Sequence, residues 1–195
     1  LTLDETARVV AICAQLGIRR VRITGGEPLL RHDLAQLAAR LARLPGIEDL
    51  SLSTNGVRLA GGAQALHRAG VQRLNISLDS LDPGRFAELT GGGRLLKVLD
   101  GIEAARRAGF APIKINMVVM RGVNEDEIEA MVAFCLERDL TLRFIETMPI
   151  GESGREATDH YLPLEAIRER LERHYTLLPG IAAGGILAFA KAMGE

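Results

Sequence analysis

Short runs of β-favouring residues alternate along the chain with longer runs in which apolar residues recur at helical spacing. The β-rich runs predict strands, listed by residue number: 20–24, 50–53, 71–79, 112–120 and 140–146. The helical runs predict helices, again by number: one that follows Thr2, then 34–44, 60–69, 95–108, about 125–137 and 163–174. Strand–helix units in series favour a parallel sheet with right-handed crossovers.

The start of the first helix has a recognisable signature. Thr2 and Glu5 have the spacing of a capping box, in which each side chain satisfies an orphan amide of the other residue. We expect this helix to end at Gly17 and to bury one apolar set: Val9, Ile12, Cys13 and Leu16.

Side chains within the predicted strands separate into two faces. One face is apolar in each strand and suits packing against helices. The other face is polar, with these members: Arg22, Thr24, Ser51, Ser53, Asn55, Asn75, Ser77, Asp79, Lys114 and Asn116. An open parallel sheet covered on both sides would be apolar on both faces, so we predict an incomplete α/β barrel of the TIM type with a polar lumen. The exposed face of a two-layer α+β fold would give the same parity, and that alternative stays open.

Candidate chemistry gathers after and within these strands. The loop from Thr24 to Pro28 carries two glycines whose free amides suit a carboxylate or phosphate. An ordinary strand-to-helix turn without a ligand would explain the same glycines. Lys114 would be a costly cation inside a barrel unless it met an anion, and Arg22 raises the same question. Together they favour an anionic ligand, with an internal ion pair of Lys114 to Asp79 or Glu146 as the alternative.

Composition narrows the function classes. The 195 residues suit one compact domain, and the formal charge of −1 with no Trp argues against a nucleic-acid partner. No signal peptide or membrane-spanning run is evident, so we expect a cytoplasmic protein without a membrane partner. The two cysteines cannot hold an iron–sulfur cluster, and the four histidines lack metal-ligand spacing, so we assign no metal ligand.

Several motifs carry a resemblance. The segments 22–31 (RITGGEPLLR), 53–56 (STNG) and 75–80 (NISLDS) resemble radical S-adenosylmethionine enzymes. Further segments make the chain similar to the GTP 3′,8-cyclase family: 90–92 (TGG), 114–116 (KIN), 121–124 (RGVN) and 142–148 (LRFIETM). The order and spacing agree from Leu1 to about Glu152.

The resemblance implies a role for each matching position. Gly26, Ser77 and Met148 fall where the family contacts S-adenosylmethionine. Contacts to GTP are implied for Arg22, Ser53, Lys114 and Arg20, and Ser53 stands where the family usually has Thr. The implied reaction converts GTP to (8S)-3′,8-cyclo-7,8-dihydroguanosine 5′-triphosphate, the first step of molybdenum cofactor biosynthesis. By pathway, the downstream partner is cyclic pyranopterin monophosphate synthase.

The sequence also departs from the family. The family holds one [4Fe-4S] cluster with a Cys-x3-Cys-x2-Cys motif upstream of Leu1 and a second cluster near its C-terminus, and neither cysteine set is in this chain. We therefore divide the chain into a partial barrel core, 1–152, and a C-terminal helix with a divergent or truncated tail, 153–195, and expect no cyclase activity from it alone. A non-catalytic remnant that binds nucleotide, or a radical enzyme acting on a peptide or small metabolite, are the alternatives.

Overall fold

The computed structural model describes residues 1–147, 159–182 and 185–192, which group into two compact units. The first unit comprises Leu1–Leu78 and Asp82–Ile115, and the second comprises Asp79–Leu81 and Asn116–Glu195. The elements of the first unit are α1 (Leu3–Gln15), β1 (Arg20–Ile23), the 3-10 turn η1 (Pro28–Leu30), α2 (Leu34–Ala42), β2 (Asp49–Thr54), η2 (Leu59–Gly61), α3 (Ala63–Arg68), β3 (Arg73–Ser77), α4 (Pro83–Thr90) and α5 (Leu95–Ala108). Strand β4 (Ile113–Val118) continues from the first unit into the second.

The second unit continues with a shorter series of elements. They are η3 (Glu125–Glu127), α6 (Ile128–Glu137), β5 (Thr141–Ile145), α8 (Leu164–Leu171), β6 (Tyr175–Ala182) and β7 (Gly185–Ala192). Arg170 of α8 forms a two-point ion pair with Glu129 of α6, at 2.5 and 2.6 Å, and also donates to the Glu125 carbonyl. Bidentate pairs of this kind fix orientation as well as distance, so α8 is held on α6.

The main sheet has the strand order β1-β2-β3-β4-β5. Strands β1 and β2 pair in parallel, as do β2 and β3, with Arg22 opposite Ser51 and Ser53 opposite Asn75. The sheet runs in chain order and ends at β1 and β5, so it is open. The predicted series of strand–helix units is confirmed.

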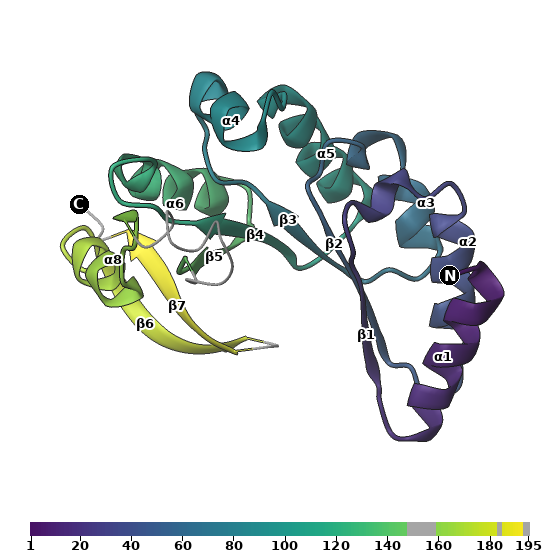
Figure 1. Cartoon of the computed structure of the whole chain (residues 1–195). Helices are drawn as coiled ribbons and strands as arrows, with labels where there is room; N and C mark the ends of the chain where they lie inside the picture. Colours follow the sequence, from purple (N-terminus) through teal and green to yellow (C-terminus); the bar gives the residue numbers. More distant parts are fainter. Residues whose placement is uncertain (148–158, 183–184, 193–195) are drawn as a thin grey trace. The chain divides into compact units, whose positions relative to one another are not determined.

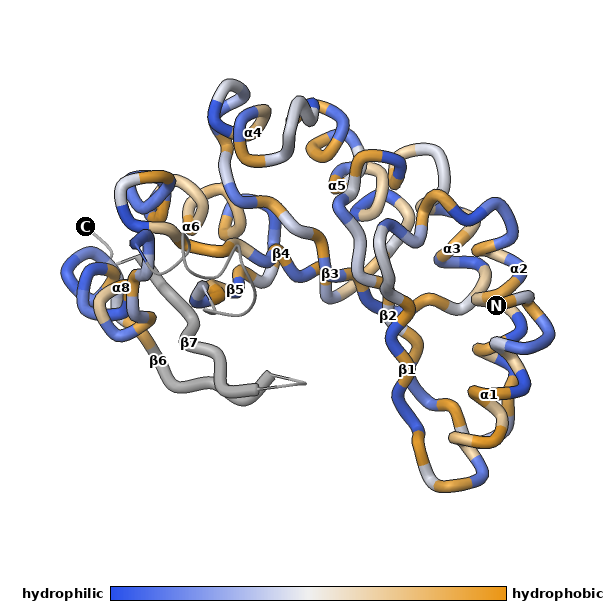
Figure 2. Tube along the Cα trace, in the orientation of Figure 1, coloured by the Kyte–Doolittle hydropathy of each residue, from blue (hydrophilic) through white to orange (hydrophobic). Residues whose placement is uncertain are grey.

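The apolar faces of the strands form the core of the first unit. Leu50, Leu52, Leu74 and Ile76 are at most 1% exposed, as the parity of the sequence predicts. Helices α1, α2, α3 and α5 lie together on one side of β1–β3 (Figure 1). The alternation of polar and apolar residues is visible as blue and orange bands along β1 (Figure 2).

Helix α1 confirms its predicted cap but not its predicted burial. Thr2 Oγ1 accepts from the Glu5 amide and Glu5 accepts from the Thr2 amide, at 3.2 and 2.8 Å. Val9, Ile12 and Leu16, expected in the core, are 53%, 51% and 80% exposed, and the buried residue is Ala7. Helical periodicity identifies residues that share a face, but packing against α2 decides which face is covered.

Helix α4 and the strands β6 and β7 were not predicted. Helix α4 begins at the Asp82-Pro83 pair, where the Asp82 side chain accepts from the Arg85 amide at 2.7 Å, and ends at Gly91 in a left-handed conformation. Strands β6 and β7 form an antiparallel hairpin where a divergent tail was expected. The boundary at 152 falls outside the described residues, so that division of the chain stays a prediction.

Candidate functional site

The glycine loop after β1 presents bare backbone. Gly25 has φ +151°, a conformation that favours glycine, and a methyl group placed on Gly25 or Gly26 would meet no atom within 4 Å. Pro28 begins η1, and Glu27 precedes it as its N-cap. The amides and carbonyls around Gly25 and Gly26 are therefore reachable by a ligand at the carboxyl ends of the strands, where ligands bind in parallel α/β folds.

Glu27 bridges this loop to the turn after β2. Its carboxylate accepts from the Leu29 amide at 2.9 Å, from the Thr54 hydroxyl at 2.7 Å and from the Asn55 amide at 2.8 Å. Thr54 Oγ1 in turn accepts from the Gly56 amide at 3.0 Å. One side chain thus joins two loops that follow neighbouring parallel strands.

The turn after β2 is itself seated on α5. Gly56 has φ +77°, and a methyl group there would lie 3.0 Å from both Ile76 and Val98. A methyl group on Gly101 of α5 would lie 2.5 Å from the Gly56 carbonyl oxygen. The two glycines therefore allow a backbone approach that no larger residue would permit.

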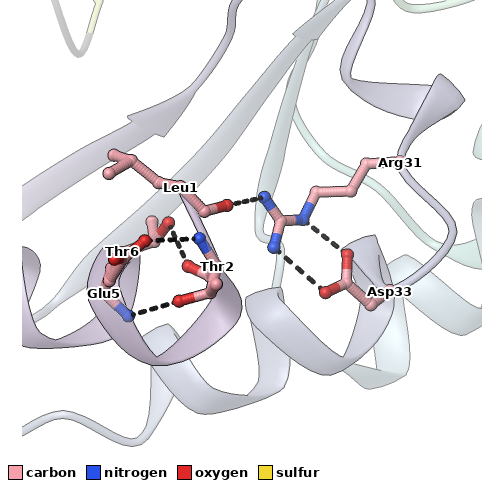
Figure 3. A network of polar contacts seen from close by, with 6 residues as sticks. All are labelled: Leu1, Thr2, Glu5, Thr6, Arg31 and Asp33. Carbon is pink, nitrogen blue, oxygen red and sulfur yellow. Dashed lines mark hydrogen bonds and ion pairs between the residues drawn. The ribbon is translucent and has the colours of Figure 1, made fainter.

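Arg31 fixes the segment that follows the glycine loop, directly after η1 (Figure 3). Its guanidinium donates to both carboxylate oxygens of Asp33, at 2.5 and 3.0 Å, and to the Leu1 carbonyl at 3.2 Å. Leu1 precedes the capping box that starts α1, so the loop is tied to the beginning of that helix. Side chains that follow the two glycines, Glu27 and Arg31, therefore fix the C-terminal side of the glycine loop.

Cations gather on the polar face of the first unit. In register, Arg20 lies opposite Asp49, Arg22 lies opposite Ser51, and Ser51 lies opposite Arg73. Arg73 pairs with Asp49 through two contacts, one of them between Arg73 Nε and Asp49 Oδ1 at 3.1 Å. Arg20 and Arg22 are exposed, so their guanidinium groups are available to an anionic ligand.

The residues singled out from the sequence have varied surroundings. Ser53 is half-buried in β2, and Ser77 is exposed at the end of β3. Lys114, in β4, is only 5% exposed. Met148 lies outside the described residues. Gly26 and Ser53 are brought together indirectly, because each directly precedes a member of the Glu27–Thr54 hydrogen bond.

The sequence analysis did not identify Glu27 and Thr54 as partners. A glutamate beside a glycine pair and a threonine in a separate strand give no joint signal in a single sequence. The parallel pairing of β1 with β2 supplies the link, since it places the ends of both strands side by side. The only hint in the sequence is that both residues directly follow residues assigned to a ligand.

In the second unit a buried amide joins β4 to the residues that follow β3. Asn124, fully buried, donates to the carbonyls of Asp79 and Val118 at 2.8 and 2.9 Å, and accepts from the Met120 amide at 2.8 Å. Burial raises the pKa of Asp79, opposed by the hydrogen bond from the Val118 amide at 2.8 Å. These contacts satisfy buried backbone groups, and we assign them a structural role.

In the part of the chain that the structure describes, the side chains do not fit an iron–sulfur cluster. Among the described residues no group of three or more His, Cys, Asp or Glu could hold a metal ion. Cys13 is half-buried on α1, and Cys135 is buried in α6. Cluster ligation requires thiolates, whereas burial raises the pKa of the Cys135 thiol to about 12. Within the same described ranges, no helix is long and apolar enough to cross a membrane.

The two thiols should differ sharply in reactivity. Treating the native protein with iodoacetamide at pH 8 is expected to label Cys13 and to leave Cys135 unlabelled, because a thiol with a pKa of about 12 holds almost no thiolate at that pH. Peptide mass spectrometry gives the readout, and labelling in denaturant should modify both. Equal labelling rates in the native state would contradict the burial of Cys135.

Comparison with known proteins gives a consistent picture. The profile of the radical SAM superfamily matches residues 1–135. A GTP 3′,8-cyclase of Listeria welshimeri is 49% identical over 169 residues, which cover 87% of this chain and 51% of that protein. A GTP 3′,8-cyclase of Hydrogenovibrio crunogenus is 48% identical over 174 residues, covering 89% and 53%. The chain thus spans about half the length of the curated relatives it matches.

One solved structure illustrates the likeness of fold. Streptococcus suis SuiB bound to S-adenosylmethionine superposes with a TM-score of 0.65 at 18% identity, covering 89% of this chain and 40% of that one. At this identity the likeness concerns the fold alone. It confirms the predicted α/β fold of partial-barrel type, since the five described strands form an open sheet.

Proposed function

The chain belongs to the radical SAM superfamily, and we propose that the protein of which it forms part is a GTP 3′,8-cyclase. That enzyme would convert GTP to (8S)-3′,8-cyclo-7,8-dihydroguanosine 5′-triphosphate in the first step of molybdenum cofactor biosynthesis. The observation that carries the proposal is the pairing of an open glycine loop with a strand face rich in cations, in a chain 48–49% identical to cyclases.

The glycine loop suits the amino-acid part of S-adenosylmethionine. The exposed backbone at Gly26 offers hydrogen-bonding groups to an ammonium and a carboxylate, and the exposed hydroxyl of Ser77 offers a further contact. We assign Met148 to the same ligand from its sequence motif. When bound with a reduced [4Fe-4S] cluster, S-adenosylmethionine supplies a 5′-deoxyadenosyl radical. The cluster would need more thiolates than the two cysteines of this chain provide.

The cationic face suits a triphosphate. Arg20 and Arg22 are exposed on β1, where their planar guanidinium groups can each donate twice to phosphate oxygens. Lys114 adds a buried cation, and the hydroxyl of Ser53 adds a neutral donor. The role of these side chains is to hold GTP in one orientation beside the cofactor, which is the main contribution of protein to radical chemistry.

Other proposals follow from the same assignment. As a cyclase, the protein would be cytoplasmic and would supply its product to cyclic pyranopterin monophosphate synthase. The alternative is a radical enzyme acting on a peptide or small metabolite, and the three cations Arg20, Arg22 and Lys114 favour a triphosphate over such a substrate. The presence of only two cysteines favours the separate idea that the chain alone is a non-catalytic remnant.

The proposal is tested with the complete protein, reconstituted with iron and sulfide without oxygen and supplied with S-adenosylmethionine and a chemical reductant. GTP is expected to give the cyclised nucleotide together with about one 5′-deoxyadenosine per product, measured by liquid chromatography and mass spectrometry. The 195-residue chain treated alike is expected to give neither product. Cleavage of S-adenosylmethionine that does not respond to GTP would point to another substrate and defeat the proposal.

A further inference from the structure

The Glu27 carboxylate accepts more hydrogen bonds than a residue that only caps a short helix would accept. A cap of η1 requires only the hydrogen bond from the Leu29 amide, yet the same carboxylate also accepts from the Thr54 hydroxyl and the Asn55 amide. We propose that Glu27 is a positioning residue that sets the placement of the cofactor loop relative to the substrate strand. This inference rests on the proposed function, because it takes Gly26 and Ser53 as contacts of the two ligands.

The glycine loop needs an external support. Gly25 and Gly26 have no side chains with which to fix themselves, and no atom lies within 4 Å of where their Cβ atoms would be. Glycine loses more conformational freedom on ordering than any other residue, so an unsupported loop would pay that cost when it binds a ligand. The hydrogen bonds of Glu27 order the loop during folding, so less conformational entropy is lost when the ligand binds.

The turn that Glu27 holds is a suitable fixed point. Thr54 is 5% exposed, and its hydroxyl both donates to Glu27 and accepts from the Gly56 amide. Gly56 is in turn enclosed by Ile76, Val98 and the backbone of α5. The loop after β1 is therefore bonded to a turn that packing in the core of the first unit already holds in place.

The bridge also connects the two proposed ligands by a short path. Gly26 directly precedes Glu27, Ser53 directly precedes Thr54, and the contact between Glu27 Oε1 and Thr54 Oγ1 is 2.7 Å. A displacement of the loop would change the distance between cofactor and substrate. Radical transfer depends on that distance, and misplacement by about 1 Å can cost about a hundredfold in rate.

Glu27→Gln tests the proposal with little change of volume. The new amide nitrogen must face either the Asn55 amide or the Leu29 amide, so one acceptor becomes a donor that opposes another donor. In the complete reconstituted protein, we expect the Kd for S-adenosylmethionine to rise about tenfold, the effect of losing one hydrogen bond to a charged group. We also expect more than one 5′-deoxyadenosine per cyclised product, because a radical formed out of place is lost.

Thr54 and Glu48 provide the matched variants. Thr54→Val removes the bridging hydroxyl and should reproduce both changes. Thr54→Ser keeps the hydroxyl and should give near-normal values. The Glu27→Gln/Thr54→Val double variant should be little worse than either single variant, because both substitutions break the same contact. Glu48→Gln, which alters an exposed ion pair with Arg19, should leave both quantities unchanged.

The outcomes separate this inference from the proposed function. Unchanged Kd and unchanged product ratio in both Glu27→Gln and Thr54→Val would overturn the positioning role, as would fully additive effects in the double variant. If the parent protein binds S-adenosylmethionine but forms no cyclised nucleotide, the proposed function fails. The comparison of Kd values by calorimetry then still decides whether Glu27 positions the loop.

Discussion

Replacing Lys114 by Met in the complete protein is expected to weaken GTP binding roughly tenfold to a few hundredfold. Lys114 is 5% exposed in β4, and a charge-assisted hydrogen bond from such a group is worth about 1.5–3 kcal/mol. Met keeps most of the buried stem and so avoids a cavity, which limits the change to loss of the ammonium. Calorimetric titration with GTP and with S-adenosylmethionine measures the effect, and binding of the cofactor is expected to stay within about twofold.

Lys97→Met is the matched control for Lys114. Lys97 is exposed on α5, so the same substitution there should leave both affinities and the melting temperature unchanged. If Lys114 instead balances an internal carboxylate, its loss would strand that charge. Both ligands would then weaken together with a large fall in melting temperature, and that result would remove Lys114 from the GTP site.

Gly101→Ala is expected to lower the free energy of unfolding by about 2 kcal/mol. The added methyl group would lie 2.5 Å from the Gly56 carbonyl oxygen and 3.1 Å from Leu59 Cβ, and backbone cannot move aside as a flexible side chain can. Overpacking against backbone lies at the upper end of its usual range, about 3 kcal/mol. The better helix propensity of Ala returns about 1 kcal/mol, which leaves a net loss of about 2 kcal/mol. The melting temperature of the complete protein without ligands should fall by roughly 2–4 °C.

Gly61→Ala controls for the general effect of adding a methyl group to this unit. No atom lies within 4 Å of the corresponding position in η2, so stability should change by less than about 0.5 kcal/mol. Thermal unfolding followed by circular dichroism compares the variants. A Gly101→Ala protein as stable as the parent would mean that α5 and the turn after β2 are less closely packed than the structure indicates.

Local signals in the sequence predicted most of the fold. The capping box of Thr2 and Glu5 and the polar–apolar parity of the strands each depend on residues close together in the sequence. The prediction of which face of α1 is buried was wrong, because that face is set by packing against α2, and the periodicity of α1 alone carries no information about α2. Helix α4 has a local signal for its start in the Asp82-Pro83 pair, although it was not among the predicted helices.

The candidate site was predictable only in part. Parity placed Arg22, Ser53 and Lys114 among the polar positions, and motifs assigned them to ligands. The connection from Glu27 to Thr54 depends on how β1 pairs with β2, and a single sequence does not specify which loop side chains then meet. Tertiary pairing therefore determines the supports of the candidate site, whereas the sequence motifs indicate which residues we propose as its contacts.

The seating of the turn after β2 on α5 has a consequence for biosynthesis. Residues far apart in the chain meet there, with Glu27 before the turn and Gly101 well after it. The ribosome releases β1, its glycine loop and β2 before α5 has been made, so the nascent chain has nothing on which to seat Gly56. Closing the intervening segment carries an entropic cost that only the docking of α5 offsets. We therefore expect the first unit to fold as a whole only after α5 has been made, and any ligand of the glycine loop to bind after that step.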